Sequence, residues 1–158
     1  MFVNFWIFQY EIIEGKGYIP NEYIVKTKDE YFLTLYRIRS RNALAPNDKK
    51  VVFLQHGFLD SAHTWISNLA NQSLGFILAD AGFDVFLGNS RGNTYSRRHA
   101  HLDPKDNRFW AFSWDEMAKY DLPSFVNFIV EETGTDKIFY VGHSQVRLLL
   151  RSFLFYSL

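Results

Sequence analysis

The sequence predicts an α/β fold in which an N-terminal hairpin is followed by parallel strands with crossover helices. Two β-rich runs, 23–27 and 31–36, flank a short polar turn, which is typical of an antiparallel hairpin. The wholly apolar run 51–54 favours a strand that is covered on both faces, as in a parallel sheet. Residues 122–130 carry apolar side chains at helical spacing, and another β run follows at 137–141.

The segments between these elements fit the same alternation. Residues 69–81 have apolar side chains at helical spacing, and Gly82 stands where a left-handed residue ends a helix. Residues 83–87 are expected to form the next strand. The polar stretch 88–113 is longer than most connections, so we expect a loop with short turns that is either functional or loosely ordered.

The clearest helix has a start signal and a stop signal. Asp121 is predicted to cap it, Pro123 lies in its first turn and Gly134 follows its last turn. Residues 147–158, which come after the strand 137–141 and a sharp turn, are apolar with arginines four apart and are expected to be helical.

Length and composition indicate one globular domain. At 158 residues, with 47% hydrophobic and 18% aromatic residues, the chain has enough apolar surface for a core. We expect an irregular N-terminal segment at 1–16 and the domain at 17–158. Seventeen basic residues balance 17 acidic ones, so the net charge of zero argues against a nucleic-acid partner.

No metal or cofactor is expected. The absence of cysteine excludes a disulfide scaffold and a thiolate metal site. His99 and His101 alternate in a polar stretch without a third nearby ligand, which favours a solvated loop over a metal site. Arg91, Arg97 and Arg98 do not belong to a phosphate-binding fingerprint, so we expect them to anchor this loop through salt bridges.

The first residues do not resemble a targeting segment. Residues 1–8 are apolar but lack a basic region and a cleavage site, so no signal peptide is recognised, and they are too few to form a stable transmembrane segment. The triplet Asn71-Gln72-Ser73 would accept a glycan at Asn71 if the chain entered the secretory pathway.

Ser144 is the candidate nucleophile. It lies in Gly142-His143-Ser144-Gln145-Val146, after an apolar strand and before a helical segment, which is the context of a nucleophile elbow. In such a turn the serine hydroxyl is exposed, and the amide of the next residue, Gln145, points at the developing oxyanion. Val146 stands where the pattern has glycine and should crowd the turn. An ordinary strand-to-helix turn is the alternative interpretation.

A second motif follows the strand 51–55. His56-Gly57-Phe58 stands where this type of sheet places its other oxyanion donor, which would be the backbone N–H of Phe58. Gly57 belongs to this supporting loop, and His56 is expected to hold the backbone of the loop rather than act as a base. A plain glycine turn is again the alternative.

These motifs and the runs around them resemble the animal acid lipases, the family that includes the gastric and lysosomal acid lipases. The similar runs extend over about residues 17–145, and they are Leu54-Gln55-His56-Gly57, Trp65-Ile66-Ser67-Asn68-Leu69, Ser73-Leu74-Gly75-Phe76-Ile77-Leu78-Ala79-Asp80-Ala81-Gly82, Leu87-Gly88-Asn89-Ser90-Arg91-Gly92-Asn93, Phe109-Trp110-Ala111-Phe112-Ser113, Asp115-Glu116-Met117-Ala118-Lys119-Tyr120-Asp121-Leu122-Pro123 and Tyr140-Val141-Gly142-His143-Ser144-Gln145.

The resemblance implies a partial α/β-hydrolase sheet that is truncated after the nucleophile elbow. It also implies that Ser144 is a serine nucleophile, that the amides of Phe58 and Gln145 form the oxyanion hole, and that no cofactor takes part. The implied substrate is a neutral lipid ester, a triacylglycerol or a sterol ester, met at a lipid–water interface in lipid catabolism. The implied location is secreted or lysosomal.

The sequence departs from the family in three places. Asp29-Glu30-Tyr31 replaces the usual Asp-Gly-Tyr of the hairpin turn, and the similarity stops at Val146. The triad order in this fold is serine, then Asp or Glu, then His, but no acidic residue and no histidine follow Ser144 in the sequence. We therefore expect the chain itself to be inactive. The alternatives are a non-catalytic binding fragment and an esterase with a rearranged triad that uses His143 or His56 as its base.

Overall fold

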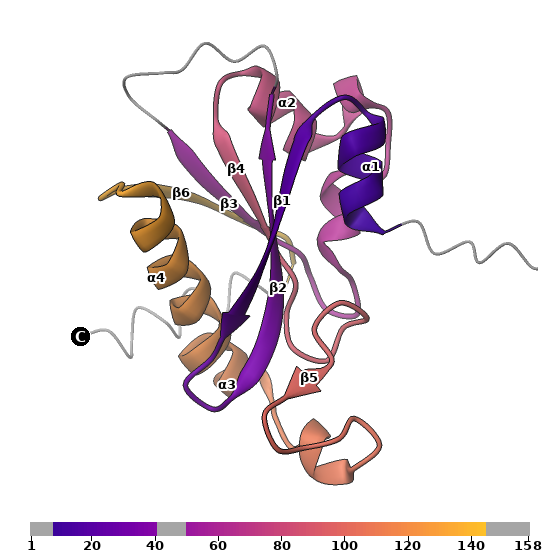
Figure 1. Ribbon diagram of the computed structural model, residues 1–158, viewed down its shortest axis with the longest axis vertical. Coiled ribbons are helices and arrows are strands. Elements are labelled where there is room, and N and C mark those ends of the chain that lie inside the picture. The colour runs from indigo at the N-terminus through magenta and orange to yellow at the C-terminus, as the bar shows by residue number, and fades with distance from the viewer. Residues whose placement is uncertain (1–7, 41–49, 145–158) are drawn as a thin grey trace, which may run out of the picture.

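The structure is a computed structural model that describes residues 8–40 and 50–144. These residues form a mixed β-sheet with helices on both faces (Figure 1). The strand order is β1-β2-β4-β3-β6, and the short strand β5 pairs with β2. The strands are β1 (Ile19–Lys26), β2 (Tyr31–Arg39), β3 (Val51–Gln55), β4 (Asp84–Gly88), β5 (Arg98–His99) and β6 (Ile138–Gly142).

The predicted hairpin is confirmed, with longer strands than the sequence indicated. β1 and β2 pair antiparallel from Ile19 opposite Arg39 to Lys26 opposite Phe32. Glu30 closes the turn at a φ of 72°, in the left-handed region where glycine is the least strained residue. The turn therefore has the conformation that suits the glycine which the resemblance led us to expect at this position.

The parallel part of the sheet brings three strand ends together. β3 pairs in parallel with β4 and with β6, so that Gln55 lies opposite both Gly88 and Gly142. The carboxyl ends of parallel strands are where open α/β sheets place their ligand sites. The segments that begin at His56, Asn89 and His143 consequently leave the sheet from one edge.

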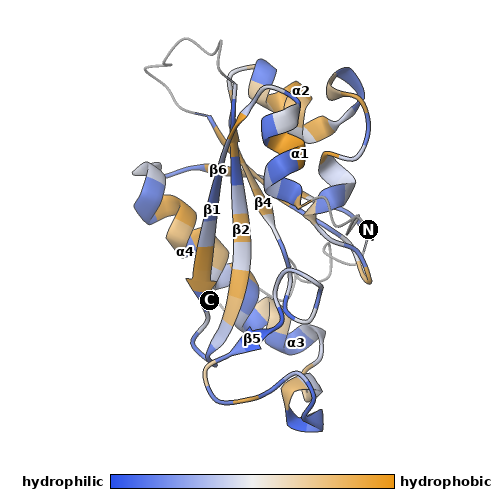
Figure 2. Cartoon of the chain, turned by 45° about the vertical axis from the view of Figure 1, so that its right-hand side comes forward, coloured by the Kyte–Doolittle hydropathy of each residue, from blue (hydrophilic) through white to orange (hydrophobic). Residues whose placement is uncertain are grey.

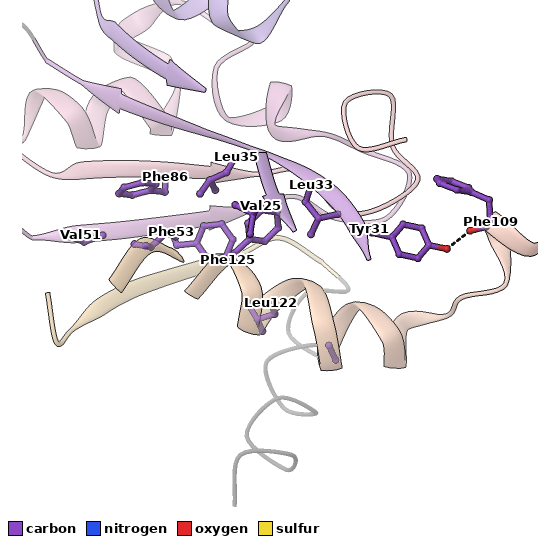
Figure 3. Packing of buried hydrophobic residues seen from close by; sticks show 12 residues of the cluster. Val25, Tyr31, Leu33, Leu35, Val51, Phe53, Phe86, Phe109, Leu122 and Phe125 are labelled. Carbon is purple, nitrogen blue, oxygen red and sulfur yellow. Dashed lines mark hydrogen bonds between the residues drawn. The ribbon is translucent and has the colours of Figure 1, made fainter. Parts of the chain in front are cut away.

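Two hydrophobic clusters join the sheet to its helices. On one face, α4 (Leu122–Thr133) packs Phe125 and Ile129 against the strands, and Figure 3 shows the Phe125 ring beside Phe53 of β3. On the other face lie α1 (Gln9–Gly15) and α2 (Leu74–Asp80), whose residues include the fully buried Ile13 and Phe76. In Figure 2 hydrophobic residues mark α2, α4 and the strands between them.

Three expectations about the helices need correction. Residues 1–16 were expected to be irregular, but α1 forms there because tertiary packing buries Gln9 and Ile13 on one side of it. The helix predicted over 69–81 is divided into η2 (Ala70–Gln72) and α2, since Ser73 between them is extended and accepts a hydrogen bond from the Asn68 N–H. Gly82 does end α2, at a φ of 86°.

The third expectation to correct is that Asp121 caps the clearest helix, because its side chain makes no capping hydrogen bond. The helical segment begins earlier, at α3 (Trp114–Glu116), which Ser113 caps, and continues through the π-helical turn η4 (Met117–Asp121) into α4. The expected stop is confirmed, because Gly134 is left-handed at a φ of 67°.

The 88–113 segment contains β5 and η3 (Asn107–Trp110), and another 3-10 turn, η1 (Ala62–Trp65), follows β3. Within residues 8–40 and 50–144, no helix is long and apolar enough to cross a membrane.

Candidate active site

Ser144 is the second residue after β6; it is exposed and has a φ of 60°. A non-glycine residue in the left-handed region costs about 1 kcal/mol, and such strain is typical of functional turns. The preceding residue is tied to the neighbouring strand, because the His143 N–H donates to the Gln55 carbonyl at 3.1 Å. The strand end therefore holds the strained serine in place. Gln145 and Val146 lie outside the described residues.

Gly57 lies against this turn. A Cβ atom at position 57 would be 3.1 Å from Nδ1 of His143, 3.2 Å from Cβ of Ser144 and 3.3 Å from the His143 carbonyl oxygen. These separations are tighter than ordinary contacts, so only a residue without a side chain lets the loop after β3 approach the turn after β6. The structure thus brings Gly57, His143 and Ser144 together.

His56 is buried and both of its ring nitrogens have partners. Nδ1 lies 2.8 Å from the Gly57 carbonyl oxygen, which can only accept a hydrogen bond. Nε2 lies 3.1 Å from the backbone N of Ser90 and 3.2 Å from Nδ2 of Asn93, which are both donors. The partners require a neutral ring with its proton on Nδ1. Burial lowers the pKa of His56 and favours the same neutral form.

The two partners of His56 Nε2, Ser90 and Asn93, come from the loop after β4, and sequence reasoning did not single them out. Asn93 also donates to Oδ1 of Asn89 at 3.0 Å, and that oxygen accepts from the Ala62 N–H at 3.1 Å. Asn89 in turn donates through Nδ2 to Oε1 of the buried Gln9 at 3.0 Å. The signal that could have identified this network is the polar run 89–93 directly after a buried strand, at the same sheet edge as His56.

Arg91 anchors the same loop through a buried ion-pair network. Its guanidinium contacts Asp29 at 2.6 Å and Asp121 at 2.7 Å and lies over the Tyr31 ring. The expected salt bridge is confirmed for Arg91, while Arg97 donates to the Gly92 carbonyl and lies over Trp110. Burial raises the pKa of Asp121 to about 6 against the opposing effect of Arg91. Burial also acts to raise the pKa of Asp29, but hydrogen bonds from Arg91 and Thr27 lower it overall.

A pocket of about 490 Å³ opens beside the loop after β3. Its apolar side chains are Phe58, Leu59, Trp110, Phe112 and Met117. The other lining residues are Gly57, Gly92 and the polar or charged His56, Asp60, Ser61, Ser90, Arg91, Asn93, Thr94 and Arg97. Leu59 has a φ of 55° and is 90% exposed, which places an apolar side chain at the surface next to the pocket. Although polar residues are numerous in this lining, most of the surface that faces the pocket is apolar, as in sites for small apolar ligands.

The described histidines offer no oriented base for Ser144. His143 is its chain neighbour, and His56 uses both nitrogens within the loops. His99 also stabilises a loop, because its Nδ1 accepts from the backbone N–H groups of His101 and Leu102. Among residues 8–40 and 50–144, no group of three His, Cys, Asp or Glu side chains could hold a metal ion.

The comparison with protein families decides the fold family, because residues 50–145, more than half of the chain, match the α/β hydrolase fold model. The chain belongs to the α/β hydrolase fold family. Residues 9–69 match a second model, described as a partial alpha/beta-hydrolase lipase region. The family membership confirms the predicted fold class.

Curated relatives of this α/β hydrolase confirm the resemblance to acid lipases. It is 57% identical over 137 residues to the lysosomal acid lipase/cholesteryl ester hydrolase of Homo sapiens, over 85% of this chain and 34% of that protein. It is likewise 57% identical to the gastric triacylglycerol lipase of Rattus norvegicus, over 85% of this chain and 35% of that protein. The chain thus spans about a third of the length of these relatives.

Solved structures support the fold of this α/β hydrolase. An esterase from Pyrococcus furiosus matches with a TM-score of 0.61 at 16% identity, over 86% of this chain and 44% of that one. An epoxide hydrolase mutant from Vigna radiata matches with a TM-score of 0.54 at 15% identity, over 87% of this chain and 35% of that one. At these identities the similarity concerns the fold alone.

Proposed function

We propose that this chain carries the nucleophile and the oxyanion loop of a serine hydrolase that cleaves carboxylic esters of neutral lipids. The observation that carries the proposal is the placement of Ser144, left-handed and exposed at the end of β6, directly against Gly57. An elbow of this kind presents a hydroxyl to a substrate next to a loop whose amide donors can stabilise negative charge.

The proposed reaction is a two-step acyl transfer. Oγ of Ser144 attacks the ester carbonyl, the alcohol leaves and an acyl-enzyme forms, and water then releases the fatty acid. The backbone N–H groups of Phe58 and Gln145 would stabilise the oxyanion of each tetrahedral intermediate. An imidazole would carry the proton at each step, and neither His56 nor His143 is arranged for that role.

A polypeptide of these 158 residues alone is therefore proposed to be inactive as a lipase. Without the base and its acid partner, the oxyanion hole and substrate binding retain only about 10³-fold of the rate enhancement. The pocket and oxyanion loop would still bind an ester without cleaving it, which favours a non-catalytic binding fragment as the second candidate.

The substrate class rests on the pocket and on the relatives. Phe58, Leu59 and Trp110 give the pocket an apolar rim, which suits an acyl chain presented at a lipid–water interface. The names of the relatives, a cholesteryl ester hydrolase and a triacylglycerol lipase, support sterol esters and triacylglycerols as substrates in lipid catabolism.

We also propose that the complete protein is secreted or lysosomal and glycosylated. The lysosomal and gastric relatives support this location. Asn71, the acceptor residue of the sequon, is exposed in η2, as a glycan acceptor must be. Treatment of the protein from secreting cells with an endoglycosidase should shift its mass, and Asn71→Gln should remove that shift.

A fluorophosphonate probe tests the proposal. We expect the purified chain to be labelled slowly at Ser144, identified by mass spectrometry, and the Ser144→Ala variant to remain unlabelled there. Turnover of a short-chain p-nitrophenyl ester should be the same for both proteins. Labelling at another residue in place of Ser144 would refute the assignment of the nucleophile, and turnover that Ser144→Ala abolishes would instead establish an esterase with a rearranged triad.

A further inference from the structure

The carboxamide of Asn93 has one orientation that satisfies all its neighbours. Its Oδ1 accepts hydrogen bonds from the backbone N–H groups of Tyr95 and Ser96, at 3.0 and 3.1 Å. A flipped amide would turn its NH₂ group toward these two donors. The Nδ2 hydrogens therefore point the other way, toward Nε2 of His56 and Oδ1 of Asn89.

This orientation fixes the proton on His56. Nε2 of His56 faces two donors, Nδ2 of Asn93 and the Ser90 N–H, so a proton on Nε2 would meet their hydrogens. The proton consequently stays on Nδ1, which donates to the Gly57 carbonyl at 2.8 Å. A neutral histidine whose one nitrogen is bound by donors has its tautomer determined by them.

The position of the Gly57 carbonyl determines the direction of the next amide. The C=O of Gly57 and the N–H of Phe58 belong to one planar peptide group, in which the two bonds point in opposite directions. A hydrogen bond that holds the carbonyl toward His56 therefore aims the Phe58 N–H away from His56. The chain of contacts runs from Asn93 through His56 to the candidate oxyanion donor.

We propose that Asn93 is a positioning residue that sets the tautomer of His56 and thereby orients the backbone N–H of Phe58. The part of this inference that concerns the oxyanion rests on the proposed function. The part that concerns the tautomer rests on the described contacts alone. Asn93 would touch no reacting atom, and its effect on Ser144 chemistry would pass through His56 and Gly57.

Two substitutions separate this role from simple packing. Asn93→Asp keeps the size of the side chain and its acceptor for Tyr95 and Ser96, but it replaces the donor toward His56 with a carboxylate oxygen. Ser90→Ala is the matched control, because it removes the hydroxyl that Gln55 contacts and leaves the backbone N–H that binds His56. Dispersed amide resonances would establish that each variant is folded.

The test measures the ring ¹⁵N shifts of His56 by NMR at neutral pH, together with the rate of fluorophosphonate labelling at Ser144. We expect a proton on Nδ1 and none on Nε2 in the parent and in Ser90→Ala, and in Asn93→Asp a proton on Nε2 and none on Nδ1. Loss of one oxyanion donor lowers the catalytic rate about 10²- to 10³-fold. Misorientation of the Phe58 N–H in Asn93→Asp should therefore slow the labelling of Ser144 by at least about 10-fold.

The parent spectrum alone can overturn the inference, whatever the variants do. A proton on Nε2 of the parent His56 would refute it, as would an unprotonated Nε2 in folded Asn93→Asp. If Ser144 of the parent resists labelling, the proposed function fails, and the ring shifts still decide whether Asn93 sets the tautomer.

Discussion

Gly57 and Ser144 pack so closely that a Cβ atom on residue 57 would lie 3.2 Å from the Cβ of Ser144. The two residues follow different strands, β3 and β6, that pair in parallel and end at the same level of the sheet. Their proximity is thus a consequence of sheet register. It couples the shape of the oxyanion loop to the position of the candidate nucleophile.

The Gly57→Ala variant should therefore disturb Ser144 more than it disturbs the fold. The added methyl group would press on His143 and Ser144, and overpacking of this kind costs about 1–3 kcal/mol. We expect fluorophosphonate labelling of Ser144 to slow by at least about 10-fold, because the nucleophile and the oxyanion loop are forced apart. Gly15→Ala is the control, since its new Cβ would meet no atom within 4 Å. Equal labelling rates for the two variants would contradict this account.

The strain at Ser144 gives a prediction that needs no enzymatic activity. Glycine adopts a φ of 60° without steric cost, while alanine keeps the Cβ that makes this conformation unfavourable. Ser144→Gly should therefore have a free energy of unfolding about 1 kcal/mol higher than that of Ser144→Ala, measured by urea denaturation. Neither variant should be labelled at position 144. An alanine variant as stable as the glycine variant would show that the elbow is unstrained.

The sequence was sufficient to predict the elements whose evidence is local. The apolar run 51–54, the glycines that end α2 and α4, and a serine directly after an apolar strand each determine a feature over a few residues. α1 could not be predicted in this way, because its buried polar residue Gln9 has its partner Asn89 80 residues away. Local propensity is weak compared with such tertiary packing.

The site was predicted in part for the same reason. Ser144 and Gly57 lie in motifs with a fixed relation to strand ends, but the contacts of Asn93 with His56 join residues 37 apart. Asp121 fits the rules for a helix cap, and its carboxylate instead pairs with Arg91 because a buried guanidinium requires a counter-charge. Such pairings depend on which loops the sheet brings together.

The buried pair of Arg91 and Asp121 should contribute more to stability than an exposed pair. Asp121→Asn leaves a buried guanidinium with one carboxylate fewer, and removal of one partner from a buried ion pair costs about 3–5 kcal/mol. Lys26→Met breaks the pair with Glu30, whose side chains are 51% and 38% exposed, and should leave the free energy of unfolding almost unchanged. Urea denaturation at neutral pH measures both. Similar losses of unfolding free energy in the two variants would contradict the view that the buried Arg91 network stabilises the fold more than an exposed pair does.

The neutral state of His56 should make the stability of the loops depend on pH. Burial lowers the pKa of His56 below its ordinary value of 6.5, so the unfolded chain binds the proton before the folded chain does as the pH falls. The contribution of His56 to the free energy of unfolding is therefore complete above pH 6.5 and decreases as the pH falls below that value. Asp121 acts in the opposite direction, because its pKa is raised to about 6 in the folded chain.

His56→Asn isolates the histidine from the aspartate, since Asp121 is present in both proteins and its effect cancels in the difference. Asparagine retains an N–H donor that can reach the Gly57 carbonyl, but it does not titrate. We expect the stability difference between the parent and His56→Asn to be smaller at about pH 5.5 than at about pH 7.5, as measured by urea denaturation. A difference that stays constant over this interval would mean that His56 has an unperturbed pKa, which would be incompatible with two donors bound to its Nε2.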